Sequence, residues 1–220
     1  MKKYIILINL FLILISSPLK AEEIKSKLKK FSKSNSEINF LDGIEIYNLD
    51  NSINVVIEIP SGSIEKWELN ETGNAIELNI KKNNFRYINY LGYPANYGFI
   101  PKTLLPVELN GDADAVDVII LGKQLQTGQV VRCNVIGMLN IKDQSLTDNK
   151  VICVELSSKL NKANSLKDLK LIAPGILEIL EIWFKNYKGE SVEILNYSKR
   201  KETFKFINDA SKHYSKRIKN

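Results

Sequence analysis

The chain has few of the residues on which several common kinds of site depend. Its 220 residues include one histidine and two cysteines. Two cysteines, Cys133 and Cys153, are too few for a disulfide scaffold or for a zinc site made of four cysteines. The single histidine, His213, excludes histidine-rich metal sites and argues against a histidine-based catalytic triad. Any acid–base or metal chemistry therefore falls to carboxylates, lysines and tyrosines.

The chain also lacks an apolar run of the length that an ordinary membrane span needs, about 20 residues. Residues 4–17 (YIILINLFLILISS) carry no charge and follow Lys2 and Lys3. A positive start followed by ~14 mostly apolar residues is typical of a secretory signal. We therefore predict a signal peptide over residues 1–21, cleaved after Ala21, and export to the bacterial periplasm. An uncleaved segment that anchors the chain in a membrane is the alternative.

The net charge of +6 comes from the two ends of the chain. Residues 34–198 have 15 basic and 21 acidic side chains, so the centre of the chain is acidic. A basic end can favour polyanions or membrane surfaces. Solvated helical ends are the simpler explanation, and we expect no nucleic-acid partner.

The middle of the chain has the composition of a β-sheet protein. We interpret residues 22–52 as an N-terminal extension with an edge element, and residues 53–220 as one domain. Short β-branched runs, several of them separated by turn-prone residues, predict five strands: Ile53–Ile59, Ala75–Ile80, Val116–Leu121, Gln129–Met138 and Val151–Leu156. The absence of alternating helices favours an antiparallel barrel or sandwich. Both cysteines lie in such runs, where we expect buried free thiols rather than a disulfide.

The pattern changes to a helical period near the C-terminus. The spacing of five apolar residues predicts a helix with one buried face: Ile176, Ile179, Leu180, Trp183 and Tyr187. A last helix is predicted from Glu202 to Arg217, with Phe204, Ile207 and Tyr214 turned inward. The protein is thus expected to be an α+β domain.

An acidic cluster, GDADAVD at residues 111–117, precedes one of the predicted strands. Its carboxylates, Asp112, Asp114 and Asp117, repel each other unless cations neutralise them. Hard cations such as Mg²⁺ prefer such oxygen ligands. The alternative is a solvated acidic loop, and an EF-hand is excluded because its glycine and its final glutamate are absent.

Further polar residues interrupt apolar stretches elsewhere. A second acidic segment, DQSLTDNK at residues 143–150, connects two predicted strands. Glu58 lies within an apolar strand, and alternation places Lys66 and Glu68 on one strand face. Carboxylates together with lysines, arginine and tyrosines suit several metals and a small, highly charged oxyanion. Phosphate chemistry is the natural candidate.

Six blocks in order resemble soluble family I inorganic pyrophosphatase: VVIEIP (55–60), KWE (66–68), YPANYGFIP (93–101), GDADAVD (111–117), DQSLTDNK (143–150) and NYKG (186–189). The resemblance implies a small closed five-stranded antiparallel β-barrel, OB-like, with flanking C-terminal helices. It implies hydrolysis of pyrophosphate to two phosphates by attack of metal-activated water. It also implies several Mg²⁺ ions per site, with Mn²⁺ as a possible substitute, and a homo-oligomer, commonly a hexamer. The alternative is a non-catalytic protein that binds phosphate or polyanions on the same scaffold.

The resemblance also implies a role for individual residues, by match of motif positions. The implied metal ligands are Glu58, Asp112, Asp117, Asp143 and Asp148. Asp114 would orient or deprotonate the attacking water, and Tyr93 and Tyr97 would support the site. The implied substrate-binding residues are Lys66, Glu68, Arg86, Lys150, Tyr187 and Lys188.

Three features depart from the family pattern. Ala115 replaces a proline in the acidic motif. Arg86 matches the usual arginine only with a one-residue shortening, so Lys81 or Lys82 are alternatives for that position. An export signal is unusual for an enzyme that ordinarily works in the cytosol.

Overall fold

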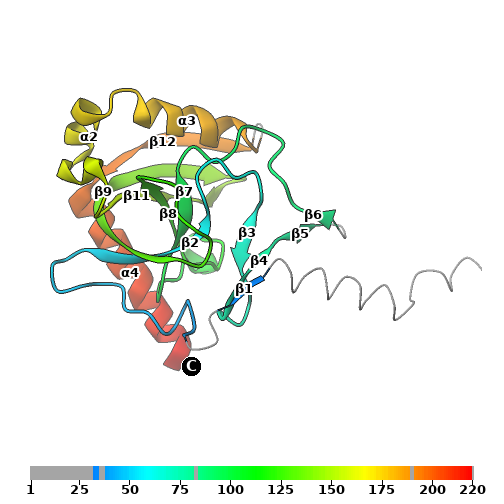
Figure 1. The fold of residues 1–220 in the computed structure, drawn as a ribbon. Helices are drawn as coiled ribbons and strands as arrows, with labels where there is room; N and C mark the ends of the chain where they lie inside the picture. Colours follow the sequence, from blue (N-terminus) through cyan, green and yellow to red (C-terminus); the bar gives the residue numbers. More distant parts are fainter. Residues whose placement is uncertain (1–31, 35–37, 82–83, 189–190, 220) are drawn as a thin grey trace, which may run out of the picture. The chain divides into compact units, whose positions relative to one another are not determined.

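The computed structural model describes residues 32–34, 38–81, 84–188 and 191–219 (Figure 1). The chain divides into two units, Met1–Ser32 and Lys33–Asn220, and the account below concerns the second unit. The predicted signal peptide and its cleavage site lie outside the described residues. Among the helices in the described ranges, none has the length and apolar character that a membrane crossing requires.

A seven-stranded sheet forms the centre of the fold (Figure 1). Its strands are β2 (Ile53–Ile59), β7 (Asn96–Ile100), β8 (Val116–Leu121), β9 (Val130–Asp143), β10 (Leu146–Thr147), β11 (Lys150–Glu155) and β12 (Val192–Lys199). Their order is β10-β9-β11-β8-β7-β2, and β12 pairs with β9. Because β2 also pairs with β9, the pairings that run through β9, β11, β8, β7 and β2 return to β9.

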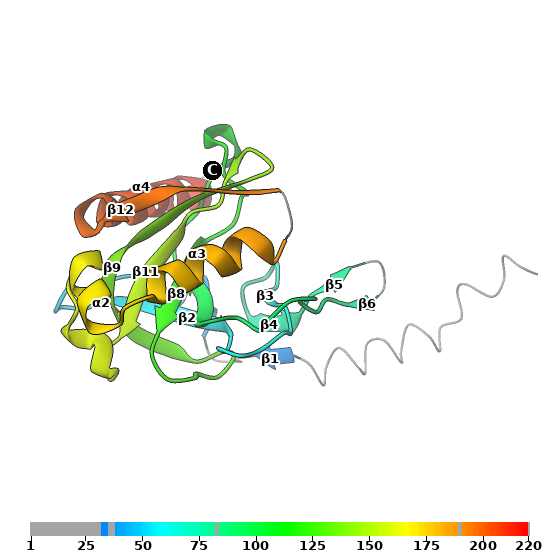
Figure 2. The same cartoon turned by 90° about the horizontal axis from the view of Figure 1, so that it is seen from above.

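The remaining elements surround this sheet. Near the N-terminal side lie β1 (Ser32–Ser34) and the antiparallel pair β3 (Trp67–Leu69) and β4 (Ala75–Leu78). The strands β5 (Ile80–Lys81) and β6 (Asn84–Phe85) pair as a hairpin that projects from the body in both views (Figures 1 and 2). Two short 3-10 helices and three α-helices complete the described chain: η2 (Val107–Leu109), η3 (Lys159–Lys162), α2 (Leu166–Ile172), α3 (Ile176–Asn186) and α4 (Arg200–Lys219). The fold is therefore mostly sheet. In Figure 2, β9 and β12 lie between the helices α3 and α4.

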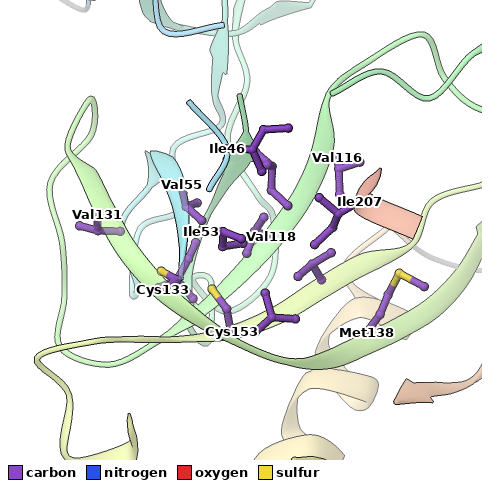
Figure 3. Packing of buried hydrophobic residues seen from close by; sticks show 14 of the residues in the cluster. Ile46, Ile53, Val55, Val116, Val118, Val131, Cys133, Met138, Cys153 and Ile207 are labelled. Atoms are coloured by element: carbon purple, nitrogen blue, oxygen red, sulfur yellow. The ribbon is translucent and has the colours of Figure 1, made fainter. Parts of the chain in front are cut away.

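The core lies among the strands and against α4 (Figure 3). Val55, Val118 and Cys153 are fully buried there, and Ile207 of α4 closes the cluster. Cys133 and Cys153 are both buried free thiols, which confirms that prediction. β-Branched residues fill these strands because their stiff side chains pack well on a pleated surface.

The predicted strands agree with the structure in part. β2 and β8 have the predicted bounds, whereas Ala75–Ile80 divides into β4 and β5 and lies outside the central sheet. The expectation of a wholly antiparallel barrel is wrong, because β11 pairs with β8 in parallel. Along the chain, β8 is followed by β9 and then by β11, and the chain reverses direction at each step. In the sheet, however, β11 lies directly beside β8, and β9 lies on the far side of β11. Two reversals leave neighbouring strands pointing the same way.

The predicted helices are present, with one error in their orientation. α3 begins at Ile176 as predicted, but Ile179 is 56% exposed and the buried residues are Leu177, Leu180, Trp183 and Phe184. The prediction therefore assigned Ile179 to the wrong face. In α4, Ile207 and Tyr214 are buried and Phe204 packs against the core, which confirms the predicted inward face. Neither α2 nor β12 was predicted.

Gly98 allows β7 and β2 to lie close together. A Cβ atom at this position would be 1.9 Å from the backbone oxygen of Val56. We expect Gly98→Ala to lower the free energy of unfolding by about 2 kcal/mol, as over-packing does. Urea unfolding of the variant measures this change. Gly175→Ala is the control, since its Cβ would meet no atom within 4 Å and only its φ of 84° opposes a side chain. Equal stability of the two variants would contradict the prediction.

Candidate active site

A polar cavity of about 170 Å³ gathers most of the residues that the sequence singled out. It is lined by twelve of the fourteen: Glu58, Lys66, Glu68, Arg86, Tyr97, Asp112, Asp114, Asp117, Asp148, Lys150, Tyr187 and Lys188. The other two lie close by. Tyr93 is buried beneath the cavity, with its ring centroid 5.3 Å from that of Tyr97, and Asp143 lines an adjoining cavity.

The parallel pairing of β8 and β11 places a lysine beside a carboxylate. Val151 is opposite Val118, so Lys150 and Asp117 occupy the preceding positions at the start of the two strands. The Lys150 side chain is 2% exposed, and its ammonium donates hydrogen bonds to Asp117 and to Asp148, the latter at 2.5 Å. This buried contact could not be read from the separation of the two residues along the chain.

The acidic loop before β8 is held by backbone hydrogen bonds. The Ala113 N–H donates to Leu105 O at 2.9 Å, and the Leu105 N–H donates to Asp114 O at 2.8 Å. Ala113 has a φ of 65°, which turns the chain sharply between Asp112 and Asp114. The N–H of Ala115, which replaces the proline of the family pattern, donates to Asp114 Oδ1 at 2.8 Å. The loop thus presents all three carboxylates to the cavity.

The second acidic segment forms a hairpin between β9 and β10. Asp143 is opposite Leu146 in that pair, and Thr147 donates its N–H to Asn110 O at 2.7 Å, next to the first acidic loop. Lys188 then links the carboxylates of the hairpin, since its ammonium lies 2.6 Å from Asp143 and 3.5 Å from Asp148. With Lys150, this produces a row of alternating charges from Asp117 through Asp148 to Asp143.

Basic residues on the opposite side of the cavity surround Glu68. Lys66 and Arg86 lie 3.5 Å and 3.6 Å from Glu68 Oε1, so Glu68 pairs with both basic groups. Asn79 also donates to the Glu68 carboxylate. No pattern in the sequence singled out Asn79, an amide between β4 and β5.

The structure places Arg86 at the cavity, and not Lys81. The Arg86 N–H donates to Asn79 O at 2.8 Å, so the two residues that flank the β5–β6 hairpin lie next to each other. The Lys66 N–H donates to Arg86 O at 3.1 Å, which fixes Arg86 beside Lys66. Lys81 lines the adjoining cavity, and Lys82 lies outside the described residues.

An aromatic cluster connects α3 to the cavity floor. The Trp183 ring stacks on Tyr187 with centroids 4.3 Å apart and lies 4.5 Å from Tyr93. Tyr97 lies between two cations, with Lys66 Nζ 5.4 Å and Lys150 Nζ 5.7 Å from its ring centroid. Such contacts favour the charged lysines. The aromatic residues therefore fix the positions of groups that line the cavity.

The charges of the cavity shift several pKa values. Burial, supported by Asp117 and opposed by Lys66, raises the pKa of Glu58 to about 8. Partial burial and the carboxylate of Asp117 raise the pKa of Asp114 to about 6, and the same two causes raise that of Asp112. Burial also opposes ionisation of Asp117, but the Lys150 ammonium, a hydrogen bond from Tyr97 and the charge of Lys66 together lower the pKa of Asp117. These shifts indicate that the cavity contains more carboxylates than its own cations neutralise.

The donor set suits divalent cations of the hard type. Within the described ranges, no three histidine, cysteine, aspartate or glutamate side chains lie close enough together to hold a metal ion. Asp117, Asp148 and Asp143 are instead paired with Lys150 and Lys188. Six carboxylates and four cationic side chains line the cavity. Oxygen donors with an excess of negative charge are the ligands that Mg²⁺ and Mn²⁺ prefer.

Residues 55–215 match the family described as inorganic pyrophosphatase. The chain belongs to the inorganic pyrophosphatase family. It is 32% identical over 183 residues to the inorganic pyrophosphatase of Xylella fastidiosa, a match that covers 78% of this chain and 97% of the relative.

Solved structures of the pyrophosphatase family share the fold. The type I inorganic pyrophosphatase of P. falciparum has a TM-score of 0.76 and 27% identity over 81% of this chain, which spans 64% of that protein's length. An N-terminally truncated vacuolar soluble pyrophosphatase of Trypanosoma cruzi, solved in complex with PPi, has a TM-score of 0.80 and 25% identity. That match covers 83% of this chain and 80% of the other.

Proposed function

We propose that this chain hydrolyses inorganic pyrophosphate to two phosphates, as the names of its relatives state for them. One observation carries the proposal: twelve of the fourteen residues implied by the motifs line a single charged cavity. A protein that only bound polyanions would have no use for Asp114, yet Asp114 lines this cavity with the other carboxylates. The non-catalytic alternative therefore has no support.

The cationic side chains bind the two phosphates of the substrate. Pyrophosphate carries several negative charges, which repel an incoming nucleophile. Lys66, Arg86 and Lys188 line the cavity from two sides and screen this charge. Arginine and lysine also stabilise the charge that develops on the leaving phosphate as the bridging bond breaks. The Glu68 carboxylate, 3.6 Å from the Arg86 guanidinium, holds this group at the cavity.

Asp114 is the group that acts on the attacking water. Its Oδ1 accepts the Ala115 N–H at 2.8 Å, which fixes the orientation of the carboxylate. The second oxygen remains to accept a proton from water aligned with the phosphorus–oxygen bond. Tyr93 and Tyr97 are buried below, and the Tyr97 ring contacts both Lys66 and Lys150. Proton removal and alignment are thus assigned to one side chain on one ordered loop.

Divalent cations complete the site in this proposal, as they do in the family. Bound cations screen the substrate and lower the pKa of water. Glu58, Asp112, Asp117, Asp143 and Asp148 are the proposed ligands. Lys150 and Lys188 line the cavity and pair with these carboxylates, so both would be free to bind phosphate oxygens once cations neutralise Asp117, Asp143 and Asp148.

The metal requirement gives the test of the proposed function. We expect the purified protein to release two phosphates per pyrophosphate with Mg²⁺ or Mn²⁺, measured by a colorimetric phosphate assay. Ca²⁺ should compete with Mg²⁺ without supporting turnover, because its larger and more flexible coordination shell positions water less strictly. Equal rates with Ca²⁺, or phosphate release in the presence of a chelator, would contradict the assignment of the carboxylates.

The architecture and assembly are further parts of the proposal. The return of the strand pairings to β9 supports a small closed barrel whose end carries the cavity. Exposed apolar residues on α2 and α3 support a homo-oligomer, and a hexamer is the form the resemblance implies: Leu171 is 74% exposed, Ile179 56% and Ile182 60%. Light scattering of the purified protein measures the assembly.

Export to the periplasm stays a proposal based on residues 1–21 alone. The support is the positive start followed by the apolar run of residues 4–17 described above. Mass spectrometry of the N-terminus in the native host would reveal cleavage after Ala21, whereas an intact N-terminus would favour a membrane anchor.

A further inference from the structure

The last helix, α4, carries a strong positive charge. Its 20 residues include seven basic and two acidic side chains, whereas residues 34–198 have more acidic than basic side chains. The helix is therefore a basic element on an acidic body. Four of its lysines are exposed to solvent: Lys201, Lys205, Lys212 and Lys216.

These four lysines lie along one line of the helix, and we call them the lysine ridge. Each residue advances an α-helix by about 100°, so the four positions fall within an arc of about 60° and span about 22 Å along the axis. The buried residues of α4 lie on the opposite side of the helix: Thr203, Ile207, Ala210 and Tyr214. That side faces β9 and β12 (Figure 2). The ridge therefore points away from the fold.

The ridge is not arranged as a helix face that only meets water. Lys201 and Lys205 lie one turn apart, and so do Lys212 and Lys216. Like charges at this spacing destabilise a helix, whereas a glutamate four residues before a lysine stabilises it. In the described part of the chain, the ridge has one ion pair, between Lys212 Nζ and Asp209 Oδ1 at 2.9 Å. The ridge thus retains a repulsion between lysines that an external anionic partner would relieve.

The side chains around the ridge do not suit a nucleic acid. Proteins that bind single strands offer aromatic rings on which bases stack, but Phe204 and Phe206 pack against the core. Proteins that read duplex DNA use arginine, asparagine or glutamine at base edges. The ridge contains only lysine, and the neighbouring amide of Asn208 already accepts the Tyr47 hydroxyl at 2.6 Å. A line of exposed lysines without these features fits a flat surface of anionic headgroups instead.

The N-terminal sequence gives this chain a reason to meet a membrane. Residues 4–17 have the apolar character of an export signal, and either a cleaved signal or a retained anchor takes the chain to a bilayer. The surface proposed above for assembly lies on α2 and α3, and β9 and β12 lie between α3 and α4 (Figure 2). An oligomer formed through α2 and α3 therefore leaves the lysine ridge exposed.

We propose that the lysine ridge of α4 docks the protein on the surface of a membrane that contains anionic phospholipids. The apolar side of α4 is buried in the core, so the contact is electrostatic and the helix does not insert into the bilayer. Such attraction acts over about one Debye length and weakens as salt is added. The proposal does not depend on the reaction assigned to the cavity, because the described lining of that cavity includes no residue of the ridge.

The test measures how the full chain partitions onto two kinds of vesicle, by sedimentation. One kind contains phosphatidylcholine alone, and the other contains equal parts of phosphatidylcholine and phosphatidylglycerol. The ratio of the two partition coefficients cancels the contribution of the apolar run, because that contribution does not require a charged headgroup. Replacing all four ridge lysines by glutamine should lower this ratio about a hundredfold, since each lysine near an anionic surface contributes about fivefold. Glutamine and lysine have similar helix propensities, so the thermal transition and phosphate release should stay at the wild-type level.

A matched control removes the same charge from another part of the surface. It replaces four exposed lysines of η3 and α2 by glutamine: Lys159, Lys162, Lys167 and Lys170. This variant should change the ratio by less than about fivefold, the share of a single lysine at the membrane. If the control and the ridge variant lower the ratio equally, net charge governs binding and the ridge is not the docking surface.

A charge reversal separates binding from the stability of the helix. Lys201→Glu places a glutamate four residues before Lys205, an arrangement that stabilises a helix. It should therefore leave the thermal transition no lower than that of the wild type, and it should lower the vesicle ratio by more than Lys201→Gln does. An unchanged ratio in the variant without ridge lysines, or a wild-type ratio that added salt does not lower, overturns the proposal. Ridge-dependent binding to a DNA oligonucleotide that is tighter than binding to the anionic vesicles, measured by fluorescence anisotropy, overturns the membrane as the partner.

Discussion

Asp117→Ala should reduce phosphate release from pyrophosphate by at least about a thousandfold, the upper end of what the loss of one electrostatic group costs an active site. Asp117 lies where the two acidic segments meet, and it accepts a hydrogen bond from the Lys150 ammonium. It is also a proposed metal ligand. The substitution therefore removes a cation site and releases Lys150 from its position. The loss should fall on kcat as well as on kcat/KM, because both effects act on the transition state.

Two further variants separate chemistry from folding. Asp209→Ala removes an exposed aspartate that pairs with Lys212 on α4, and it should keep wild-type activity. Asp117→Asn keeps the shape of the side chain and removes its charge. If Asp117→Asn is as inactive as Asp117→Ala while both show the wild-type thermal transition, the charge is what the reaction needs. Activity within tenfold of wild type in Asp117→Ala would contradict the assignment of the acidic loop.

The residues of the site could be predicted from the sequence because each motif is local. GDADAVD was singled out without knowledge of the fold because its three carboxylates lie close together along the chain, and all three line the cavity. The alternation of Lys66 and Glu68 likewise follows from strand geometry, and both line the cavity. The same holds for the buried thiols of Cys133 and Cys153, which lie in apolar strands. The chemistry of neighbouring residues and the side-chain alternation of the strands were enough to predict these features.

Features that depend on strand pairing could not be predicted in this way. The contact of Lys150 with Asp117 needs the parallel register of β11 and β8, which two separate reversals of the chain create. The choice of Arg86 over Lys81 depends on the hairpin that brings Arg86 back to Asn79. The one-residue shortening left Lys81 and Lys82 open as alternatives, since a hairpin changes the separation along the chain without changing where the chain returns.

The orientation of α3 illustrates a different difficulty. Two apolar stripes overlap on this helix, because Ile179 and Ile182 are as apolar as Leu177 and Leu180. Periodicity alone cannot choose between two such stripes. The choice comes from tertiary partners: Trp183 packs against Tyr93, and its ring nitrogen donates to Leu91 O at 2.9 Å. Those contacts turn Ile179 outward.

Lys150→Met should destabilise the fold as well as abolish activity. Methionine has a similar volume but no charge, so Asp117 and Asp148 lose the buried cation that they share. Removing one partner from a buried ion pair costs about 3 kcal/mol. For a chain of this size, that corresponds to a fall in Tm of roughly 9 °C. Circular dichroism or calorimetry measures this change, and phosphate release should fall at least about a hundredfold.

The metal-free and metal-loaded proteins should respond differently to this substitution. A divalent cation bound by Asp117 and Asp148 replaces part of the charge that Lys150 supplied. Added Mg²⁺ should therefore raise the Tm of Lys150→Met more than that of the wild type, since binding to the folded state stabilises it by mass action. Lys170→Met on α2 is the matched control and should change stability by no more than about 0.5 kcal/mol. If Lys150→Met melts like the control, or if Mg²⁺ raises both transitions equally, the shared buried lysine is not what holds the two carboxylates together.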